Sequence, residues 1–235
     1  MDKEIRKNEV PLCIGIIMDG NRRWAKENGL PRVEGHWRGY QKMQEVISWC
    51  KEIGVKNLVV YAFSTENWNR SEEEVSFLLD IFRTMVTKEL EQFKNENVRV
   101  RFVGQKERFS EDIRGGMNKM EEATKTGEYS LFVCLSYGGR AEILSAIQKI
   151  TREKTKEEID QLSENDVRNY LWTKEMPDPD IIIRTGGEKR LSNFLPWQSV
   201  YSELFFSETF FPAFLKEQFV KIIDEYQQRE RRKGG

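Results

Sequence analysis

The chain has 235 residues, of which 38% are hydrophobic and 11% aromatic, enough to build a substantial core. Charged residues make up 33% of the chain, yet the formal net charge is only -1. This balance argues against a nucleic-acid-binding protein, because such proteins usually carry a basic excess. No apolar run approaches the length of a membrane span, and residues 1–7 lack the apolar core of a signal peptide. We therefore expect a cytoplasmic protein, with peripheral contact to a membrane surface left open.

The strand-like segments of the chain alternate with helix-like ones. The predicted strands are Leu12–Met18, Asn57–Phe63, Val98–Val103, Tyr129–Ser136, Asp180–Ile183 and Glu203–Phe206. The predicted helices are Gly39–Ile53, Glu72–Phe93, Glu107–Thr124, Ala141–Thr151, Glu164–Trp172 and Leu215–Arg229. Such alternation predicts an α/β fold with a mostly parallel, six-stranded sheet and helices on both faces. The charged stretch 151–164 is expected to be a surface connection, so residues 1–235 are predicted to form a single domain.

The three cysteines, Cys13, Cys50 and Cys134, lie in apolar segments without a metal-type spacing. We expect them to be buried thiols in a reducing compartment.

The first strand ends abruptly in polar residues. The apolar residues 14–18 are followed by Asp19-Gly20-Asn21-Arg22-Arg23-Trp24. Asp19 would lie at the carboxyl end of a parallel strand, where α/β proteins bind ligands, and Gly20 permits a sharp turn into a helix. Two interpretations stay open on this stretch alone. Asp19 is either an ordinary helix cap or part of a corner that binds a cation and phosphate.

Polar residues also follow the other predicted strands, in the segments 64–70, 137–140 and 184–192. In a parallel sheet these loops open on one edge, so their side chains are expected to meet in one cleft. The expected members are Asp19, Arg23, Asn67, Arg70, Arg184, Arg190 and Ser192. Several arginines beside glycine-rich turns are typical of a multi-phosphate site. Asp19 and Glu203 are the candidate oxygen ligands of a cation there.

Some of these features have simpler explanations. Gly138-Gly139 is interpreted as a turn. Arg184 follows a buried strand and needs an anionic partner, which is either a ligand or one of the acids Asp178 and Glu188. Neither a P-loop nor a nucleophile elbow is present, and Asn21 stands where a haloacid-dehalogenase-type phosphatase would have its second acid.

Three further features allow two interpretations each. His36 is the only histidine, and it is either structural or a donor to phosphate. The helix 72–93 has one broad apolar face, which indicates either core packing or the wall of an apolar tunnel. The basic C-terminus, residues 229–235, is either a solvated tail or a segment that reaches a phosphate site in a partner subunit.

Taken together, the motifs resemble those of the cis-prenyltransferases, of the undecaprenyl diphosphate synthase type. The resemblance covers nearly the whole chain in the right order. It rests on residues 18–25, Gly35-His36 followed by Gly39, and the segments 63–70, 184–188, 190–198, 201–204 and 232–234.

This resemblance implies a homodimer that uses Mg2+ to add isopentenyl diphosphate units to an allylic diphosphate, usually farnesyl diphosphate. The new double bonds are cis, and the product is a long polyprenyl diphosphate such as undecaprenyl diphosphate. By the same likeness, Asp19 holds Mg2+ and assists departure of the allylic diphosphate, and Asn67 helps to remove the proton. Glu203 resembles a metal ligand contributed across the dimer, and Arg232 and Gly234 resemble a tail that reaches the neighbouring site.

The resemblance also divides the substrate-binding residues into groups. The allylic diphosphate site would be lined by Gly20, Asn21, Arg23, Arg32 and His36. Isopentenyl diphosphate would be bound by Arg184, Arg190 and Ser192. Further members of the matching motifs are expected to contact substrate; these are Arg22, Trp24, Ser64, Glu66, Trp68 and Arg70.

The chain departs from the family pattern at a few positions. Arg22 replaces a common glycine, Cys13 a frequent histidine and Ser71 a frequent proline, and Trp37-Arg38 fill a gap that is usually occupied by smaller residues. None of these changes removes a presumed catalytic group, but Arg22 makes substrate preference less secure. Two other functions are kept as alternatives: a non-catalytic subunit of a heteromeric prenyltransferase, and an Mg2+-dependent phosphohydrolase.

Overall fold

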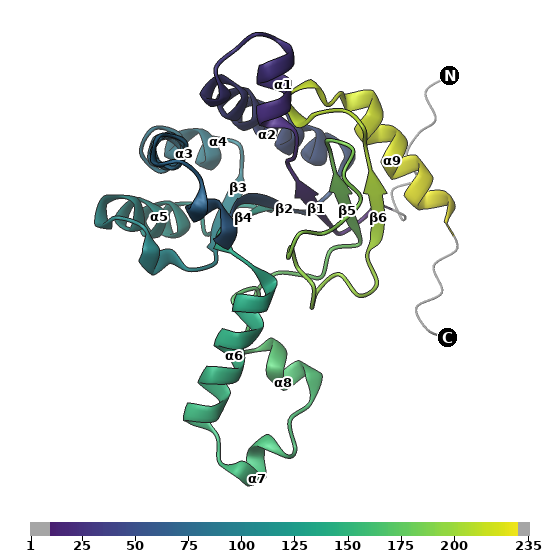
Figure 1. The fold of residues 1–235 in the computed structure, drawn as a ribbon. Helices are drawn as coiled ribbons and strands as arrows, with labels where there is room; N and C mark the ends of the chain where they lie inside the picture. Colours follow the sequence, from purple (N-terminus) through teal and green to yellow (C-terminus); the bar gives the residue numbers. More distant parts are fainter. Residues whose placement is uncertain (1–9, 230–235) are drawn as a thin grey trace.

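The computed structural model describes residues 10–229 and contains a single six-stranded sheet, all of whose strand pairs are parallel (Figure 1). The strands are β1 (Cys13–Ile17), β2 (Asn57–Ser64), β3 (Val98–Val103), β4 (Tyr129–Tyr137), β5 (Ile181–Arg184) and β6 (Glu203–Phe206). Their order across the sheet is β3-β4-β2-β1-β5-β6. The predicted α/β class and the parallel sheet are confirmed, and every predicted strand is found to within two residues at each end.

The α-helices are α1 (Asn21–Glu27), α2 (Arg32–Ile53), α3 (Glu72–Lys88), α4 (Leu90–Asn95), α5 (Glu111–Ala123), α6 (Gly139–Glu153), α7 (Lys156–Ile159), α8 (Glu164–Arg168) and α9 (Lys216–Gln228). Three short 3-10 helices are η2 (Thr65–Asn69), η3 (Lys106–Arg108) and η4 (Phe211–Ala213).

Several helix predictions differ from the structure. Helix α2 begins at Arg32 and not at Gly39, α5 begins at Glu111 and not at Glu107, and α8 ends at Arg168 and not at Trp172. The expected helix 72–93 is interrupted at Glu89, whose φ and ψ of -106° and 5° end α3, and the chain resumes as α4 with Phe93 buried in the core. The stretch 151–164 is partly helical, because Thr155 and Glu158 form a capping box that starts the one-turn helix α7.

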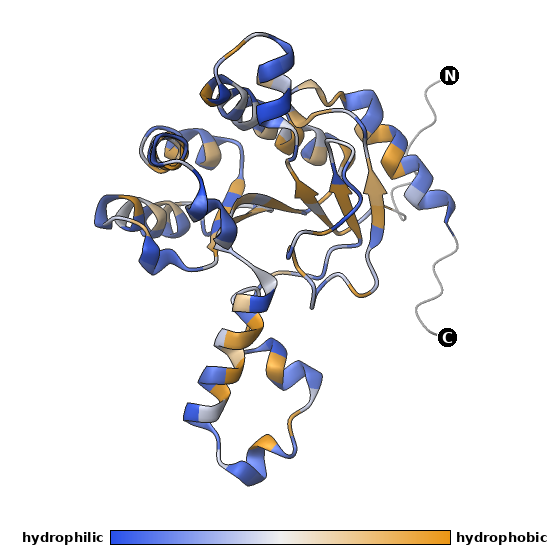
Figure 2. Cartoon of the chain, in the orientation of Figure 1, coloured by the Kyte–Doolittle hydropathy of each residue, from blue (hydrophilic) through white to orange (hydrophobic). Residues whose placement is uncertain are grey.

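One face of the sheet carries the main hydrophobic core. Apolar side chains of all six strands on this face pack against α2, α3, α4, α5 and α9. Figure 2 shows the strands as mainly hydrophobic, whereas the outer helices alternate hydrophobic and hydrophilic positions, as expected for elements with one buried face.

Helices were predicted on both faces of the sheet, but non-helical segments cover much of the other face. Its buried side chains pack against Met176, Phe194 and Leu195, which lie in non-helical segments before and after β5. Tyr61 of β2 stacks on Phe194 with ring centroids 4.7 Å apart. These segments follow no helical period, so a sequence pattern could not reveal their packing.

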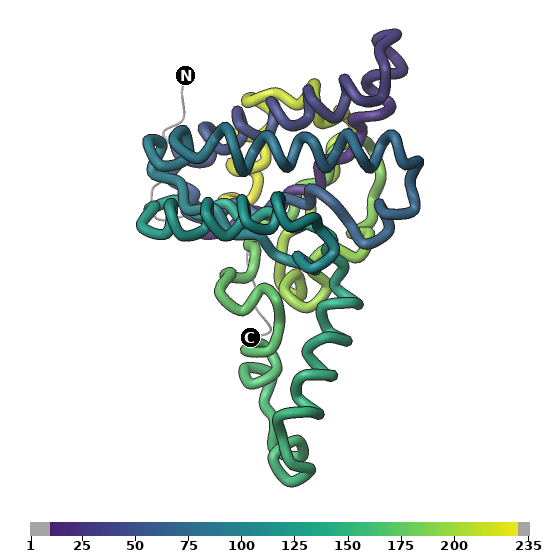
Figure 3. Tube along the Cα trace, turned by 90° about the vertical axis from the view of Figure 1, so that its left-hand side faces the viewer, coloured from purple at the N-terminus to yellow at the C-terminus, as the bar shows by residue number. Residues whose placement is uncertain are grey.

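Helices α6, α7 and α8 project away from the sheet as an arm, which is visible from two directions (Figures 1 and 3). Leu144 and Ile147 on α6 are about half exposed. Among the described residues, no helix is long and apolar enough to cross a bilayer. The three cysteines are free and buried, as predicted, and burial raises the pKa of the Cys13, Cys50 and Cys134 thiols.

Helix α1 is held close to α2 by glycines. A Cβ on Gly35 would collide with the backbone carbonyl oxygen of Asn21, and one on Gly39 would lie 2.5 Å from the Asn21 side-chain oxygen. This close approach places the amino end of α1, with its arginines, against the end of β1.

Gly35→Ala is expected to destabilise the protein by about 1–3 kcal/mol, because the obstacle is backbone that cannot rotate away. The measurement is the free energy of unfolding in urea. Gly115→Ala in α5 is the matched control, since a Cβ there meets nothing within 4 Å. This control should gain up to about 1 kcal/mol from helix propensity. Equal effects of the two substitutions would contradict the close packing of α1 on α2.

Candidate active site

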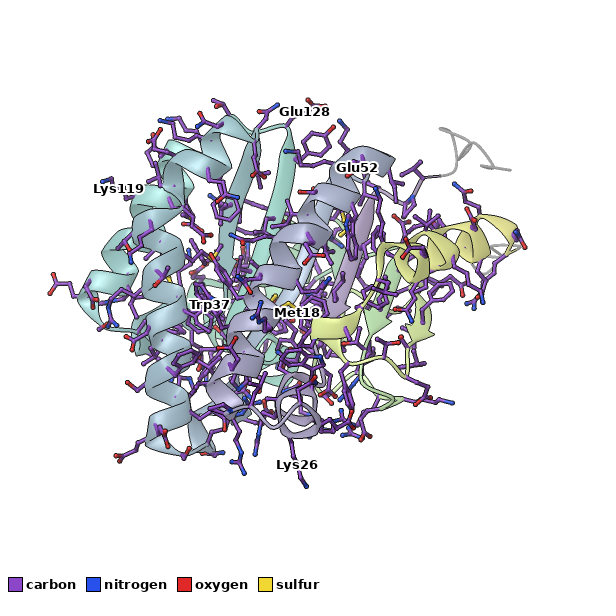
Figure 4. All side chains as sticks on the ribbon, turned by 90° about the horizontal axis from the view of Figure 1, so that it is seen from above. Met18, Lys26, Trp37, Glu52, Lys119 and Glu128 are labelled. Atoms are coloured by element: carbon purple, nitrogen blue, oxygen red, sulfur yellow. The ribbon has the colours of Figure 1, made fainter. Side chains whose placement is uncertain are left out.

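The polar ends of β1, β2, β4 and β5 meet at the carboxyl edge of the sheet, as predicted. Figure 4 shows Met18 and Lys26 toward this edge, whereas Glu52 and Glu128 lie at the opposite, amino edge. Asp19 follows β1, and Gly20 adopts φ 103°, where any side chain would also collide with Phe210. Gly20 therefore fixes the turn that leads from β1 into α1.

Asp19 is fixed in place by Thr185 and bridges two arginines. The Asp19 backbone N–H donates to Thr185 Oγ1 (3.1 Å), and that hydroxyl donates to the Asp19 carbonyl (2.8 Å). One carboxylate oxygen accepts from Arg23 (3.1 Å) and the other from Arg184 (2.8 Å). Asp19 is therefore not a helix cap, because α1 has no side-chain cap.

Arg184 is the most deeply buried cation of the site, with a side chain only 5% exposed. Besides Asp19 it donates to Ser192 Oγ (2.7 Å) and to the carbonyl of Arg190. The expectation that Asp178 or Glu188 would neutralise Arg184 is wrong: Asp178 pairs with Arg168, and Glu188 with Arg190 and Arg23. The buried Arg184 Nε has no hydrogen-bond partner, so the guanidinium keeps donor capacity for a ligand.

A cavity of about 550 Å³ opens beside Asp19. Its walls come from the ends of β1, β2 and β5, from η2 and α2, and from the loop after β5. Of the predicted site residues, those that line it are Asp19, Asn21, His36, Ser64, Glu66, Asn67, Arg70, Arg184 and Ser192.

A second cavity of about 640 Å³ adjoins the first and shares Asp19, Asn21, His36 and Arg70 with it. It is strongly basic. The remaining predicted residues that line it are Gly20, Arg22, Arg23 and Arg32, and Lys26 adds a further cation. Two adjoining cavities thus share one carboxylate.

Between the cavities lies a buried ionic cluster centred on Glu74, which sequence reasoning missed. Its carboxylate contacts His36 Nε2 (3.1 Å), Arg70 (2.7 Å) and Arg22 (3.8 Å). Burial would raise the pKa of Glu74, but Arg70, His36 and Arg22 outweigh it, so this pKa lies below its ordinary value. Burial lowers the pKa of His36 from 6.5 despite the neighbouring Glu74. His36 is therefore neutral at pH 7 and donates its Nε2 proton to Glu74.

The motif after β2 forms the 3-10 helix η2. Asn67 accepts from the Ser64 backbone N–H (3.0 Å) and so caps its own turn. Glu66 accepts from Asn193 (3.2 Å). Trp68 turns away from the two cavities: its Nε1 donates to Ser136 (2.9 Å), and its ring packs edge-on against Phe63.

Four predicted residues do not line either cavity: Trp24, Trp68, Arg190 and Glu203. Arg190 is exposed and contributes its carbonyl to Arg184. The prediction that Glu203 and Asp19 hold one cation is wrong within a single chain. Glu203 pairs in register with Ile181 at the amino end of β5, whereas Asp19 follows the carboxyl end of β1. At ~3.3 Å per residue, three residues of strand separate Glu203 from that edge by about 10 Å. Instead, Glu203 forms an ion pair with Arg229.

A divalent cation would fit this site only if a single protein carboxylate held it and substrate phosphates and water completed its shell. Within residues 10–229, no cluster of three or more His, Cys, Asp or Glu side chains could hold a metal. Mg2+, however, commonly binds proteins through one or two carboxylates and completes its shell with substrate phosphates and water. Asp19 could supply that single carboxylate: its side chain is 28% exposed and lies next to arginine-lined cavities.

Residues that position the site were harder to find from the sequence than those that line it. Thr185 and Glu74 bind other protein groups, and their roles depend on which elements meet across the fold. The glycine spacing at Gly35 and Gly39 was the one available signal for the approach of α1. The terminal motif 232–234 lies outside the described residues.

The parallel sheet and the arginine-lined cavities at its carboxyl edge define the class: an α/β protein whose site suits phosphorylated ligands. Comparisons with known proteins make this specific. The family model described as "Putative undecaprenyl diphosphate synthase" matches residues 17–234. The chain belongs to this family, the cis-prenyltransferases, and is a prenyltransferase that acts in prenyl chain elongation.

Individual relatives agree with this assignment. The isoprenyl transferase of Thermotoga maritima is 46% identical, over 96% of this chain and 97% of its own. A tritrans,polycis-undecaprenyl-diphosphate synthase (geranylgeranyl-diphosphate specific) of Pyrococcus horikoshii is 45% identical, over 99% of this chain and 90% of its own. The crystal structure of lavandulyl diphosphate synthase from Lavandula x intermedia, in complex with dimethylallyl diphosphate, superposes with a TM-score of 0.91. It is 30% identical and covers 97% of this chain and 100% of its own.

The buried histidine predicts a pH dependence of stability. His36 resists protonation in the folded state, whereas in the unfolded chain it takes up a proton near pH 6.5. Its contribution is therefore complete above about pH 6.5 and is lost as the pH falls below that value. We expect the free energy of unfolding of His36→Gln, measured from pH 7.5 to 5.5, to fall less steeply than that of the wild type. Parallel curves would contradict the neutral, buried His36.

Proposed function

We propose that this prenyltransferase condenses isopentenyl diphosphate with an allylic diphosphate, with Mg2+ as cofactor, and repeats the step to give a long polyprenyl diphosphate with cis double bonds. One observation carries the proposal: two adjoining cavities, both lined by arginine, share the single carboxylate Asp19. Two diphosphate groups can thus be bound on either side of one metal-binding acid.

The two cavities suggest a division of labour between the substrates. The strongly basic cavity at α1 suits the allylic diphosphate, because Arg22, Arg23 and Arg32 line it together with the free N–H groups of the helix start. The cavity beside β5 suits isopentenyl diphosphate, because the buried Arg184 and Ser192 already lie 2.7 Å apart and form a phosphate-binding pair.

In the condensation, the bond between the allylic carbon and its diphosphate oxygen breaks, and the diphosphate leaves with the electron pair. The double bond of isopentenyl diphosphate attacks the allylic carbon. The resulting cation then loses a proton to water or to the released diphosphate, and the electron pair of the broken C–H bond forms the new double bond. Bound Mg2+ would neutralise charge on the leaving diphosphate. The arginines around Asp19 stabilise the same developing charge. Asn67, which accepts from the Ser64 backbone N–H, lines the cavity assigned to isopentenyl diphosphate and is proposed to help remove the proton.

The growing chain needs an apolar path away from the diphosphates. We place it along the inner face of α3, which carries Leu78, Phe82 and Met85, because Leu78 also lines the cavity beside Asp19. In the structure these side chains pack in the main core. The tunnel therefore stays a prediction, and it requires these side chains to move apart around the product.

Two allylic diphosphates are candidates for the primer. The family resemblance points to farnesyl diphosphate, whereas the name of the Pyrococcus horikoshii relative specifies geranylgeranyl diphosphate. Parallel assays with both primers decide between them, and mass analysis of the products gives the chain length.

We also propose a homodimer built on the arm and on edge strand β6. Val200 and Tyr201, each about 70% exposed, line one groove with Ile143 of α6. Glu203, two residues after Tyr201 at the start of β6, cannot reach Asp19 within its own chain. Pairing of two copies here would cover the apolar residues and give Glu203 a route to the partner's site.

Leu144→Asp is expected to shift the protein from dimer to monomer in sedimentation velocity, because a buried carboxylate in an apolar interface is costly. Leu215→Asp is the matched control, since both leucines are 55% exposed but Leu144 lies on the arm helix α6, whereas Leu215 lies at the start of α9. Equal sedimentation of both variants and the wild type would contradict this interface.

The proposed reaction is tested by incorporation of labelled isopentenyl diphosphate into long prenyl diphosphates. Asp19→Asn should lower turnover about 10²- to 10³-fold, because charge stabilisation at the leaving group is lost. Asp112→Asn, on the exposed face of α5, is the control and should keep wild-type turnover. Chelation of Mg2+ should abolish activity, and its return should restore it. Circular dichroism verifies that each variant is folded.

The alternatives give different outcomes in the same assay. Phosphate release without carbon–carbon bond formation would indicate a phosphohydrolase. No incorporation by the protein alone, with any allylic primer, would indicate a non-catalytic subunit; the retained Asp19-Gly20-Asn21 motif argues against that role. A cytoplasmic location and peripheral membrane contact stay predictions.

A further inference from the structure

Asn193 lies at the junction of three segments that sequence reasoning treated separately. It belongs to the loop after β5 and follows Ser192. Its φ is 67°, and Ser192 and Leu195 also have positive φ, at 49° and 51°. Three non-glycine residues in this sparsely populated region within four positions indicate a loop held in shape by its surroundings.

The side chain and the backbone carbonyl of Asn193 form hydrogen bonds to two other segments of the chain. Its side-chain oxygen accepts from the Arg140 backbone N–H (2.9 Å), and its carbonyl accepts from the Gly139 N–H (2.8 Å). Its side-chain nitrogen donates to Glu66 of η2 (3.2 Å). Asn193 therefore joins the isopentenyl-side loop both to the start of α6 and to the motif after β2.

Glu66 is well suited to receive this bond. Burial raises its pKa, but hydrogen bonds from its own backbone and from Ser64, Thr65 and Asn193 outweigh that effect, and its pKa lies below the ordinary value. The ionised carboxylate makes the bond from Asn193 a charge-assisted one.

Gly138 explains how the three segments come so close. A Cβ on this residue would lie 2.6 Å from Thr65 Oγ1 and 2.7 Å from Asn193 Nδ2. The φ of Gly138 is -162°, an extended backbone that any residue can adopt. Glycine is therefore required here for space and not for conformation, and the pair Gly138-Gly139 is more than the simple turn expected from the sequence.

We propose that Asn193, seated on Gly138-Gly139, is a positioning residue that fixes the isopentenyl-binding loop relative to η2. It thereby sets the position of isopentenyl diphosphate relative to Arg70, which follows η2 and also lines the cavity assigned to the allylic diphosphate. This inference rests on the proposed condensation. Arg184 and Ser192 lie on one side of the link, and Asn67 and Arg70 on the other, and all four line the same cavity.

Because Asn193 links two binding loops without itself binding a diphosphate, its substitution is expected to affect turnover more than substrate binding. The groups that bind each diphosphate remain when the link is cut, whereas the alignment of the two substrates is lost. Asn193→Gly keeps the positive φ without strain and removes both side-chain bonds. We expect kcat to fall about 10- to 100-fold, with each KM changed less than about threefold.

Asn97→Gly is a matched control. Asn97 has φ 60°, accepts a backbone N–H from Glu128 and donates to the Glu128 carboxylate, but it lies before β3 at the amino edge of the sheet. It should keep wild-type kcat. Gly138→Ala should reproduce the kcat loss of Asn193→Gly, because its Cβ displaces the same contacts.

A double-mutant cycle tests the contact itself. Asn193→Asp keeps the acceptor for Arg140 but places a carboxylate against Glu66, so it should lower kcat in the wild-type background. In a Glu66→Gln background the amide of the new side chain can donate to the aspartate, and the same substitution should cost at least about fivefold less. The cycle compares Asn193→Asp across the two backgrounds, so any separate role of Glu66 cancels.

The outcomes separate this inference from the proposed function. A wild type without condensation activity refutes the proposed function. An active wild type with unchanged kcat in Asn193→Gly, or with the same Asn193→Asp effect in both backgrounds, refutes the positioning role. A loss of kcat that is matched by Asn97→Gly also refutes it, because the effect is then one of general stability.

Discussion

The ion pair between Asp19 and Arg184 is the interaction on which the site depends. It joins the carboxyl ends of the neighbouring strands β1 and β5, and it neutralises a guanidinium that is almost fully buried. Removing one partner of a buried pair typically costs about 3–5 kcal/mol, because the other charge is left uncompensated. The same pair places a carboxylate and a buried cation side by side. The ion pair that makes burial of Arg184 tolerable therefore also builds the corner where, in the proposed reaction, a metal and two diphosphates would meet.

The fold could largely be predicted because its strands are short apolar runs and its helices have one apolar face. Val98–Val103 and Glu203–Phe206 are found with the predicted bounds. The segments before and after β5, which contribute Met176 and Phe194 to the second face, follow no regular period and were therefore not recognised as packing elements. Their shape comes from contacts across the fold, including three non-glycine residues with positive φ.

The sequence predicted those site residues that directly follow strands of the sheet. Parallel strands bring Asp19, Asn67 and Arg184 to one edge whatever the details of packing. Pairing between side chains was not predictable: Arg184 takes Asp19 rather than a nearby acid in sequence, and Glu74 gathers His36, Arg70 and Arg22. Glu203 was misplaced within the single chain although it begins the predicted strand 203–206, because the first residue of a parallel strand lies at the amino edge of the sheet, opposite Asp19.

The role of Asp19 is tested most directly by a crystal structure of the protein with Mg2+, isopentenyl diphosphate and an unreactive allylic thiodiphosphate. We expect the metal on the Asp19 carboxylate, one diphosphate at Arg184 and Ser192, and the other among Arg22, Arg23 and Arg32. A metal bound elsewhere, with both diphosphates outside the two cavities and the Asp19–Arg184 pair undisturbed, would contradict a reaction centred on the shared carboxylate.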